Sequence, residues 1–161
     1  MSKLIGKMLL TAFLISTMTA CVKEDQPIID DASVQYSDFE TEVMNQVNNY
    51  RNSIGLEKLS RLNLVSTEAE THSVYMLNKQ TLSHDNFDIR TQNLMNNASA
   101  ISIAENVAYG YKTAEELLNS WLNSPEHRRK IEEKRYTDFG ISAKNNSGGS
   151  YYVTQIFIER K

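Results

Sequence analysis

Apolar side chains recur at spacings of three and four residues over positions 39–54, which predicts a helix with one buried face. Ser37 and Glu40 form a capping box at its start, and Gly55 ends it. A second helix is predicted over about 63–78, and small residues on its buried face favour close packing. The residues that set these two faces are Phe39, Val43, Val47, Tyr50 and Ile54 in the first, and Val65, Ala69, His72, Ser73 and Met76 in the second.

A third helix is predicted in the C-terminal half. Thr113 and Glu116 form its capping box, and Ser124-Pro125 ends it. Serine is favoured at a helix N-cap and proline at the first helical position, so the same pair begins a short helix that carries His127. The apolar face of the third helix consists of Ala114, Leu117, Leu118, Trp121 and Leu122.

Two strand-like runs follow at 139–144 and 151–158, and the Asn, Ser and Gly residues between them predict a hairpin. Both faces of the second run are largely apolar, so helices must cover the sheet on each side. The predicted fold is therefore an α/β three-layer sandwich (α/β/α) with a mainly antiparallel central sheet. Asn, Gln and Ser dominate positions 87–103, where only Ile101 and Ile103 hint at a strand.

The N-terminus has the pattern of a lipoprotein signal peptide over residues 1–20. Two lysines precede an apolar stretch that is shorter than the roughly 20 residues a membrane span needs, and Met18-Thr19-Ala20-Cys21 has the form of a lipobox. Lipidation at Cys21, with an added acyl chain, would anchor the protein in a membrane. The alternative is a secreted protein with an incidental cysteine, although an unpaired thiol is a liability in an oxidising compartment.

Residues 21–36 are acidic and aperiodic, which predicts a lipid-anchored flexible tether ahead of a single domain at 37–161. Lys23-Glu24-Asp25 resembles a surface-export signal of some bacterial lipoproteins, and the alternative is an ordinary charged linker. Loss of residues 1–20 would change the net charge from -3 to -5, because the leader contains two lysines and no acidic residue. This balance argues against a nucleic-acid partner. We expect an extracytoplasmic envelope protein, with outer-membrane surface exposure left open.

The candidate chemistry lies in two histidines and a carboxylate. His84 follows Leu82-Ser83 in a polar loop, and His127 lies in the first turn of the short helix. Glu105-Asn106 interrupts an apolar stretch, where a carboxylate must find partners or face water in a cleft. Two imidazoles and a carboxylate could bind zinc with an open position or form a proton-transfer pair.

The order of these motifs resembles the CAP superfamily (SCP, or pathogenesis-related-1-like) in a short bacterial form without cysteines. The resemblance extends over about residues 39–157 and rests on seven short segments in the family's order. They are Val47-Asn48-Asn49-Tyr50-Arg51 with Gly55-Leu56 and Leu59, Ala69 with His72-Ser73 and Met76, Leu82-Ser83-His84, Ala104-Glu105-Asn106-Val107-Ala108, Trp121-Leu122-Asn123-Ser124-Pro125-Glu126-His127-Arg128, Phe139-Gly140-Ile141, and Tyr152-Val153-Thr154-Gln155-Ile156-Phe157.

This resemblance implies an α/β/α sandwich in which His84, Glu105 and His127 line a central cavity. Many members have a His-Glu-Glu-His set there, and some bind a divalent metal through the two histidines. The slot of the second glutamate is Ser124 in this sequence, and Glu126 lies nearby. The position of His72 is usually structural in the family, so we leave it out of the predicted site.

Three functions are compatible with these residues. The first is a non-catalytic binding module for a small apolar ligand, a glycan or a protein, with His84, Glu105, Asn106 and His127 as its binding residues. The second is a hydrolase or peptidase with Ser83 or Ser124 as nucleophile, and the third is a purely structural envelope protein.

No cofactor is fixed by the sequence, and two states of the cavity stay open. In the first state, His84 and His127 bind zinc, and Glu105 either ligates it or holds a bound water. A metal-free cavity in which Glu105 hydrogen-bonds both rings is the other.

Overall fold

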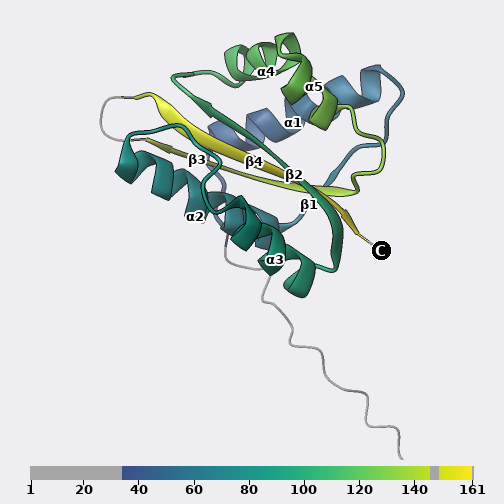
Figure 1. Ribbon diagram of the computed structural model, residues 1–161. Helices are drawn as coiled ribbons and strands as arrows, with labels where there is room; N and C mark the ends of the chain where they lie inside the picture. Colours follow the sequence, from purple (N-terminus) through teal and green to yellow (C-terminus); the bar gives the residue numbers. More distant parts are fainter. Residues whose placement is uncertain (1–33, 146–148, 161) are drawn as a thin grey trace, which may run out of the picture.

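The computed structural model describes residues 34–145 and 149–160, so the predicted signal peptide, Cys21 and most of the tether lie outside the described residues. The described residues form five helices and four strands (Figure 1). In chain order they are α1 (Asp38–Ser53), β1 (Ser60–Arg61), α2 (Asn63–Lys79), α3 (Phe87–Asn97), β2 (Ala100–Tyr109), α4 (Ala114–Asn123), α5 (Pro125–Ile131), β3 (Asp138–Asn145) and β4 (Tyr151–Arg160).

The strands form one sheet in the order β1-β3-β4-β2. Only the short β1 runs parallel to its neighbour, and the β2–β4 and β3–β4 pairs are antiparallel. Helices α2 and α3 cover one face, and α1, α4 and α5 cover the other (Figure 1). The predicted α/β/α sandwich with a mainly antiparallel sheet is therefore confirmed. Strand β2 lies at the edge, where both helical layers can reach it.

The face under α1, α4 and α5 contains the larger apolar core. The predicted capping box of α1 is present: Ser37 Oγ accepts from the Glu40 amide at 3.2 Å, and the Ser37 amide donates to Glu40 Oε2 at 2.8 Å. Predicted helix faces meet in this core, which includes Val47, Leu117, Trp121, Ile131, Phe139 and Phe157. Trp121 is 1% exposed, as its place on the apolar face of the predicted helix requires.

The opposite face packs α2 closely against β3 through small residues. Ser73 Oγ donates to the carbonyl of Ser142 at 2.9 Å, and Ser66 Oγ accepts from the Ile141 amide at 3.2 Å. A Cβ added to Gly140 would lie 2.3 Å from the Ser66 backbone nitrogen, so only glycine allows this approach. The close packing predicted for the second helix is confirmed.

Helix α3 is the main element that the hydrophobic pattern did not predict. It lies in the Asn- and Gln-rich stretch and buries only Arg90 and Leu94, so no apolar stripe marks it. Strand β2 starts at Ala100 and continues through Glu105, so it is longer than the hint of a strand at Ile101 and Ile103. Among the described residues, no helix is both long and apolar enough to span a membrane.

Candidate functional site

Glu105 is a buried carboxylate on the edge strand β2, and its side chain is 1% exposed. Arg90 of α3, itself buried, donates from Nε to Glu105 Oε2 and from Nη2 to Glu105 Oε1, both at 2.8 Å. A two-point guanidinium–carboxylate contact fixes the orientation of the carboxylate as well as compensating its charge. Glu105 is therefore committed to an ion pair inside the protein.

His84 uses the same carboxylate from the solvent side. Its Nδ1 lies 2.7 Å from Glu105 Oε1, and its side chain is 49% exposed. A carboxylate can only accept, so Nδ1 carries the proton in this contact and Nε2 is the unprotonated nitrogen of the neutral ring. A carboxylate that holds one nitrogen of a histidine in this way orients the other nitrogen toward a ligand or a substrate proton.

His72 of α2 holds the backbone next to His84 in place. It is 1% exposed, its Nε2 donates to the Ser83 carbonyl at 2.7 Å, and the same nitrogen lies 3.9 Å from Glu105 Oε1. Burial lowers the pKa of His72, so the ring is neutral near pH 7. Because it holds the residue before His84, His72 acts as a positioning residue and has almost no access to solvent.

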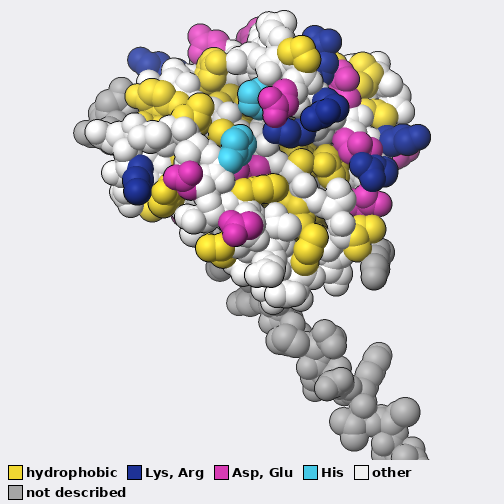
Figure 2. All heavy atoms as spheres, viewed as in Figure 1, with side chains coloured by type: hydrophobic (Ala, Val, Ile, Leu, Met, Phe, Trp, Pro, Cys, Tyr) yellow, Lys and Arg dark blue, Asp and Glu magenta, His cyan; other side chains and the backbone are white. Residues whose placement is uncertain are grey.

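His127 lies across the edge of β2, on α5. Its Nδ1 is 2.8 Å from Ser124 Oγ, and Ser124 is also the N-cap residue of α5. Burial, followed by the positive charge of Lys130, lowers the pKa of His127, and a smaller contribution comes from His84. Figure 2 shows histidine side chains close together on one face, beside acidic and basic groups.

An open cleft of about 310 Å³ lies at the edge of β2, between the two helical layers. Lys130 bridges it by donating from Nζ to the backbone carbonyl of Glu105 at 2.8 Å. Burial lowers the pKa of Lys130. The cleft thus combines an imidazole, an ammonium group and apolar surface, and its lining residues are His84, Phe87, Ile103, Ala104, Glu105, Glu126 and Lys130.

Asn106, also predicted to bind ligand, lies on the other face of the sheet from Glu105 and is 0% exposed. Its Nδ2 donates to the His127 carbonyl at 3.3 Å, and its Oδ1 has no hydrogen-bond partner among the described residues. Asn106 therefore connects β2 to α5 behind the cleft, and it is not among the residues that line the cleft.

The serine candidates do not complete a catalytic triad within the described part of the chain. Ser83 Oγ accepts from the Asp85 amide at 3.4 Å, and no imidazole contacts it. Ser124 does contact His127, but no carboxylate hydrogen-bonds that ring. His84 has its carboxylate, Glu105, but no hydroxyl. The components of a triad are thus divided between two separate pairs.

The same geometry limits what metal the cleft could hold. Over residues 34–145 and 149–160, no group of three or more His, Cys, Asp or Glu side chains is arranged to hold a metal ion. Glu105 has both oxygens engaged by Arg90 and His84, so a role as a metal ligand is not supported. Any metal would rely on His84 and His127 alone.

Sequence reasoning missed Arg90 and the supporting role of His72. A carboxylate inside an apolar strand needs a cation or several hydrogen-bond donors, so the sequence did indicate that Glu105 has a partner. It did not say which of the 17 lysines and arginines supplies the charge. Arg90 lies 15 positions from Glu105 in a stretch where no helix was predicted, so no spacing rule joins the two.

Comparison with known proteins places the chain in a family. Residues 44–157 match the CAP model, described as the cysteine-rich secretory protein family. The YkwD protein of Bacillus subtilis is 31% identical over 108 residues, which cover 65% of this chain and 42% of YkwD. The chain therefore spans less than half of that relative.

Solved structures share the fold at low sequence identity. An outer surface protein of Borrelia burgdorferi matches with a TM-score of 0.71 and 17% identity, covering 80% of this chain and 97% of that one. An extracellular SCP-domain protein of Bacillus anthracis matches with a TM-score of 0.67 and 21% identity, covering 80% and 45%. NaASP2, solved with Zn²⁺, matches with a TM-score of 0.58 and 11% identity, covering 76% and 80%.

Proposed function

This chain belongs to the cysteine-rich secretory protein (CAP) family, and we propose that it is a non-catalytic binding module that works outside the cytoplasm, tethered to the cell envelope. The observation that carries this proposal is the division of polar groups at the cleft. Arg90 compensates the charge of Glu105, and Glu105 Oε1 also accepts a hydrogen bond from His84. Glu105 is therefore unavailable as a general base.

A hydrolase is the competing function, and one contact favours it. Ser124 Oγ lies 2.8 Å from His127 Nδ1, as a nucleophile and its base would. Against this function, no carboxylate among the described residues hydrogen-bonds His127 to orient it and stabilise its protonated form. A Ser124→Ala variant tests this function on generic ester and peptide substrates. Measurable turnover that disappears in the variant would replace the binding proposal by the hydrolase.

Anchoring through Cys21 is the second part of the proposal. The lipobox places the lipid ahead of a 16-residue tether, and the match to an outer surface protein is consistent with a location outside the cytoplasm. We expect metabolic labelling with a fatty acid to mark the wild-type chain and not Cys21→Ala. Equal labelling of both proteins would remove the anchor, whereas the binding function would still stand.

Zinc is the metal that would suit His84 at the cleft together with His127 of α5, although His127 is not among the residues that line the cleft. In both rings Nδ1 is engaged, by Glu105 or by Ser124, which leaves Nε2 of His84 and of His127 as the donors. Neutral imidazole is a good zinc ligand, and a carboxylate behind it favours the correct tautomer. A zinc ion held by two protein ligands would supply a Lewis-acidic centre with open positions for an oxygen of the bound ligand.

Titration calorimetry with ZnCl₂ on the purified protein tests this site. We expect one-to-one binding at pH 7.5 that weakens as the pH falls, because protons compete with the metal for the imidazole nitrogens. The His84→Gln/His127→Gln variant should lose binding. A His72→Gln control, which removes an imidazole that does not line the cleft but keeps an amide donor for the Ser83 carbonyl, should keep it. Absence of binding by the wild type, or full binding by the double variant, would mean that the cleft works without metal.

A further inference from the structure

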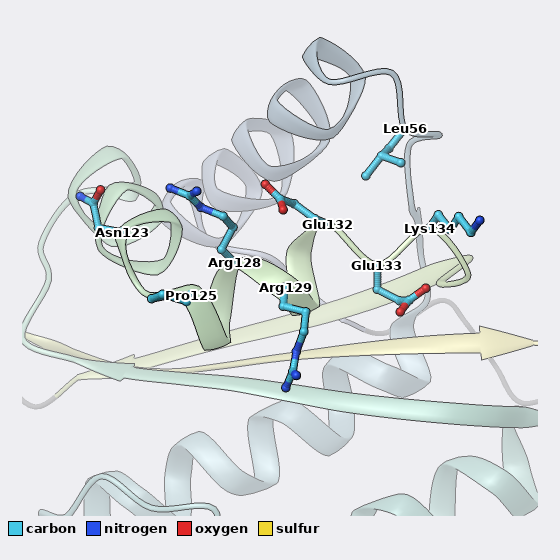
Figure 3. Close-up of a pocket in the computed structure, with 8 residues that line it drawn as sticks. All are labelled: Leu56, Asn123, Pro125, Arg128, Arg129, Glu132, Glu133 and Lys134. Carbon is cyan, nitrogen blue, oxygen red and sulfur yellow. The ribbon is translucent and has the colours of Figure 1, made fainter.

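A second hollow of about 750 Å³ lies between the residues that follow α1 and the segment formed by α5 and the residues after it (Figure 3). Leu56 forms one wall, and Arg128 and Arg129 of α5 contribute to the other. None of the residues that line the His84 cleft lines this groove. We call it the Arg128 groove, and the binding function proposed above does not use it.

The charges of the Arg128 groove are unequally available. Glu132 accepts from the Tyr50 hydroxyl, and Glu133 accepts from Arg135 Nε at 3.0 Å, which lowers the pKa of Glu133. Arg129 and Lys134 are both exposed, and neither makes a hydrogen bond or a salt bridge to another described side chain. Both acidic groups thus have donors within the protein, although the neutral Tyr50 hydroxyl leaves the negative charge of Glu132 in place, while Arg129 and Lys134 remain for a ligand.

A buried guanidinium lies directly behind this groove. Arg51 is 0% exposed and donates to the carbonyls of Glu57, Ile131 and Glu133 at 3.0, 2.7 and 3.0 Å. Its partners are neutral carbonyls, and its Nη2 has no hydrogen-bond partner among the described residues. Burial lowers the pKa of Arg51, and the negative charge of Glu133 acts in the opposite direction. The positive charge of Arg51 therefore adds to the potential at the groove.

The side chains are also widely spaced. In Figure 3, Arg128 and Arg129 point in different directions from α5, and Lys134 lies on the far side beside Glu133 and Leu56. Cations that point in different directions suit an extended ligand with repeated acidic groups better than a single small anion. Leu56 and Pro125 are the only apolar residues that line the groove. This favours a hydroxyl-rich ligand over an acyl chain or an apolar peptide.

We propose that the Arg128 groove binds an acidic carbohydrate, a linear oligosaccharide with carboxylate groups on successive sugars. Guanidinium groups match carboxylates in a two-point geometry. The Asn123 amide and the carboxylate of Glu132 suit sugar hydroxyls, and Leu56 and Pro125 suit the C–H faces of the rings. Such a ligand fits a domain whose own net charge is negative, because the attraction is confined to the groove.

Titration of the purified protein with oligogalacturonate, followed by calorimetry at low and at physiological salt, tests this proposal. We expect saturable binding that weakens with salt, because the contacts are exposed ion pairs. Arg129→Gln/Lys134→Gln should weaken binding by about tenfold or more, in line with the loss of two charge-assisted contacts. A neutral malto-oligosaccharide of the same length should not bind.

Two matched variants make the result specific. Lys79→Gln/Lys112→Gln removes the same net charge at exposed positions away from the groove, and it should bind like the wild type. His84→Gln/His127→Gln should also bind normally, which separates this site from the zinc cleft. The proposal would be overturned by no binding to the wild type at millimolar oligogalacturonate, by equal binding of the neutral sugar, or by equal weakening in the Lys79→Gln/Lys112→Gln control.

Discussion

On one face of the sheet, α1 and α4 bury large apolar side chains such as Trp121 and Phe139, although α1 also buries Glu40 and Arg51. On the other face, α2 and α3 bury hydroxyl groups, an imidazole and the Arg90–Glu105 ion pair. Both faces exclude water, but by different means. The apolar face gains its stability mainly from the burial of nonpolar side chains, whereas the polar face depends more on buried polar groups that keep their partners.

This difference explains why the cleft lies where it does. His84 extends from the polar face, where Glu105 and His72 fix its position, and His127 extends from the layer that covers the apolar face. The edge strand β2 is the element on which both layers converge. The layer of α2 and α3 therefore orients His84, and the layer of α1, α4 and α5 carries His127.

The largest expected effect comes from emptying the apolar face. Trp121→Ala should lower the free energy of unfolding by about 3–5 kcal/mol, the usual cost of removing a buried aromatic ring. Circular dichroism during urea unfolding measures it. The wild-type tryptophan fluorescence should also shift to the red on unfolding, because the ring is 1% exposed in the folded state. A loss below about 1 kcal/mol would mean that this face is not the main source of stability.

Breaking the ion pair tests the polar face. Arg90→Leu leaves the Glu105 carboxylate buried without its cation, and we expect a loss of about 3 kcal/mol, at the lower end for such a change because His84 still donates to Glu105. Replacing both partners, as in Arg90→Leu/Glu105→Leu, should recover part of the loss, since no charge is then stranded. Urea unfolding of both variants decides it, and a double variant no more stable than Arg90→Leu would contradict this view.

A smaller effect is expected where α2 approaches β3. Gly140→Ala places a methyl group 2.3 Å from the Ser66 backbone nitrogen, so the helix must move, at a cost of about 1–3 kcal/mol. Ser142→Ala is the matched control on the same strand and face. Ser142 Oγ is buried without a partner among the described residues, so its removal should change stability by less than about 0.5 kcal/mol. Equal effects of the two substitutions would argue against close packing as the cause.

The two faces also differ in how far the sequence predicts them. Apolar periodicity identified the helix that carries Trp121 and the hairpin of β3 and β4, because burial of nonpolar side chains repeats with the period of the element. The capping box of Ser37 and Glu40 could be predicted as well, because its two residues are only three positions apart. His84, Glu105 and His127 came from a resemblance to a family. They lie on three segments far apart in the chain, and His84 and Glu105 line the cleft, whereas His127 does not.

The parts that could not be predicted are those held by polar contacts. Helix α3 buries one arginine and one leucine on its inner side, which leaves no periodic signal. The partner of Glu105 is chosen by tertiary packing, and nothing in the local sequence around Arg90 marks it. Polar networks of this kind follow from the three-dimensional arrangement, whereas an apolar stripe is already visible in one dimension.

The smallest predicted effect concerns pH and the buried ring of His72. Burial lowers its folded-state pKa below the ordinary value of about 6.5, as it does for His127. Above that value both folded and unfolded chains carry a neutral ring, and stability is unaffected. Below it the unfolded chain takes up a proton that the folded chain resists, so the free energy of unfolding falls as the pH drops from about 6.5.

His72→Gln keeps an amide donor for the Ser83 carbonyl but cannot titrate. Between pH 7.5 and 5.5 the variant should lose less stability than the wild type. His127 should maintain part of the slope in the variant. Identical slopes in the two proteins would mean that His72 is protonated as readily in the fold as in water, and that the polar face holds its ring less tightly than its contacts imply.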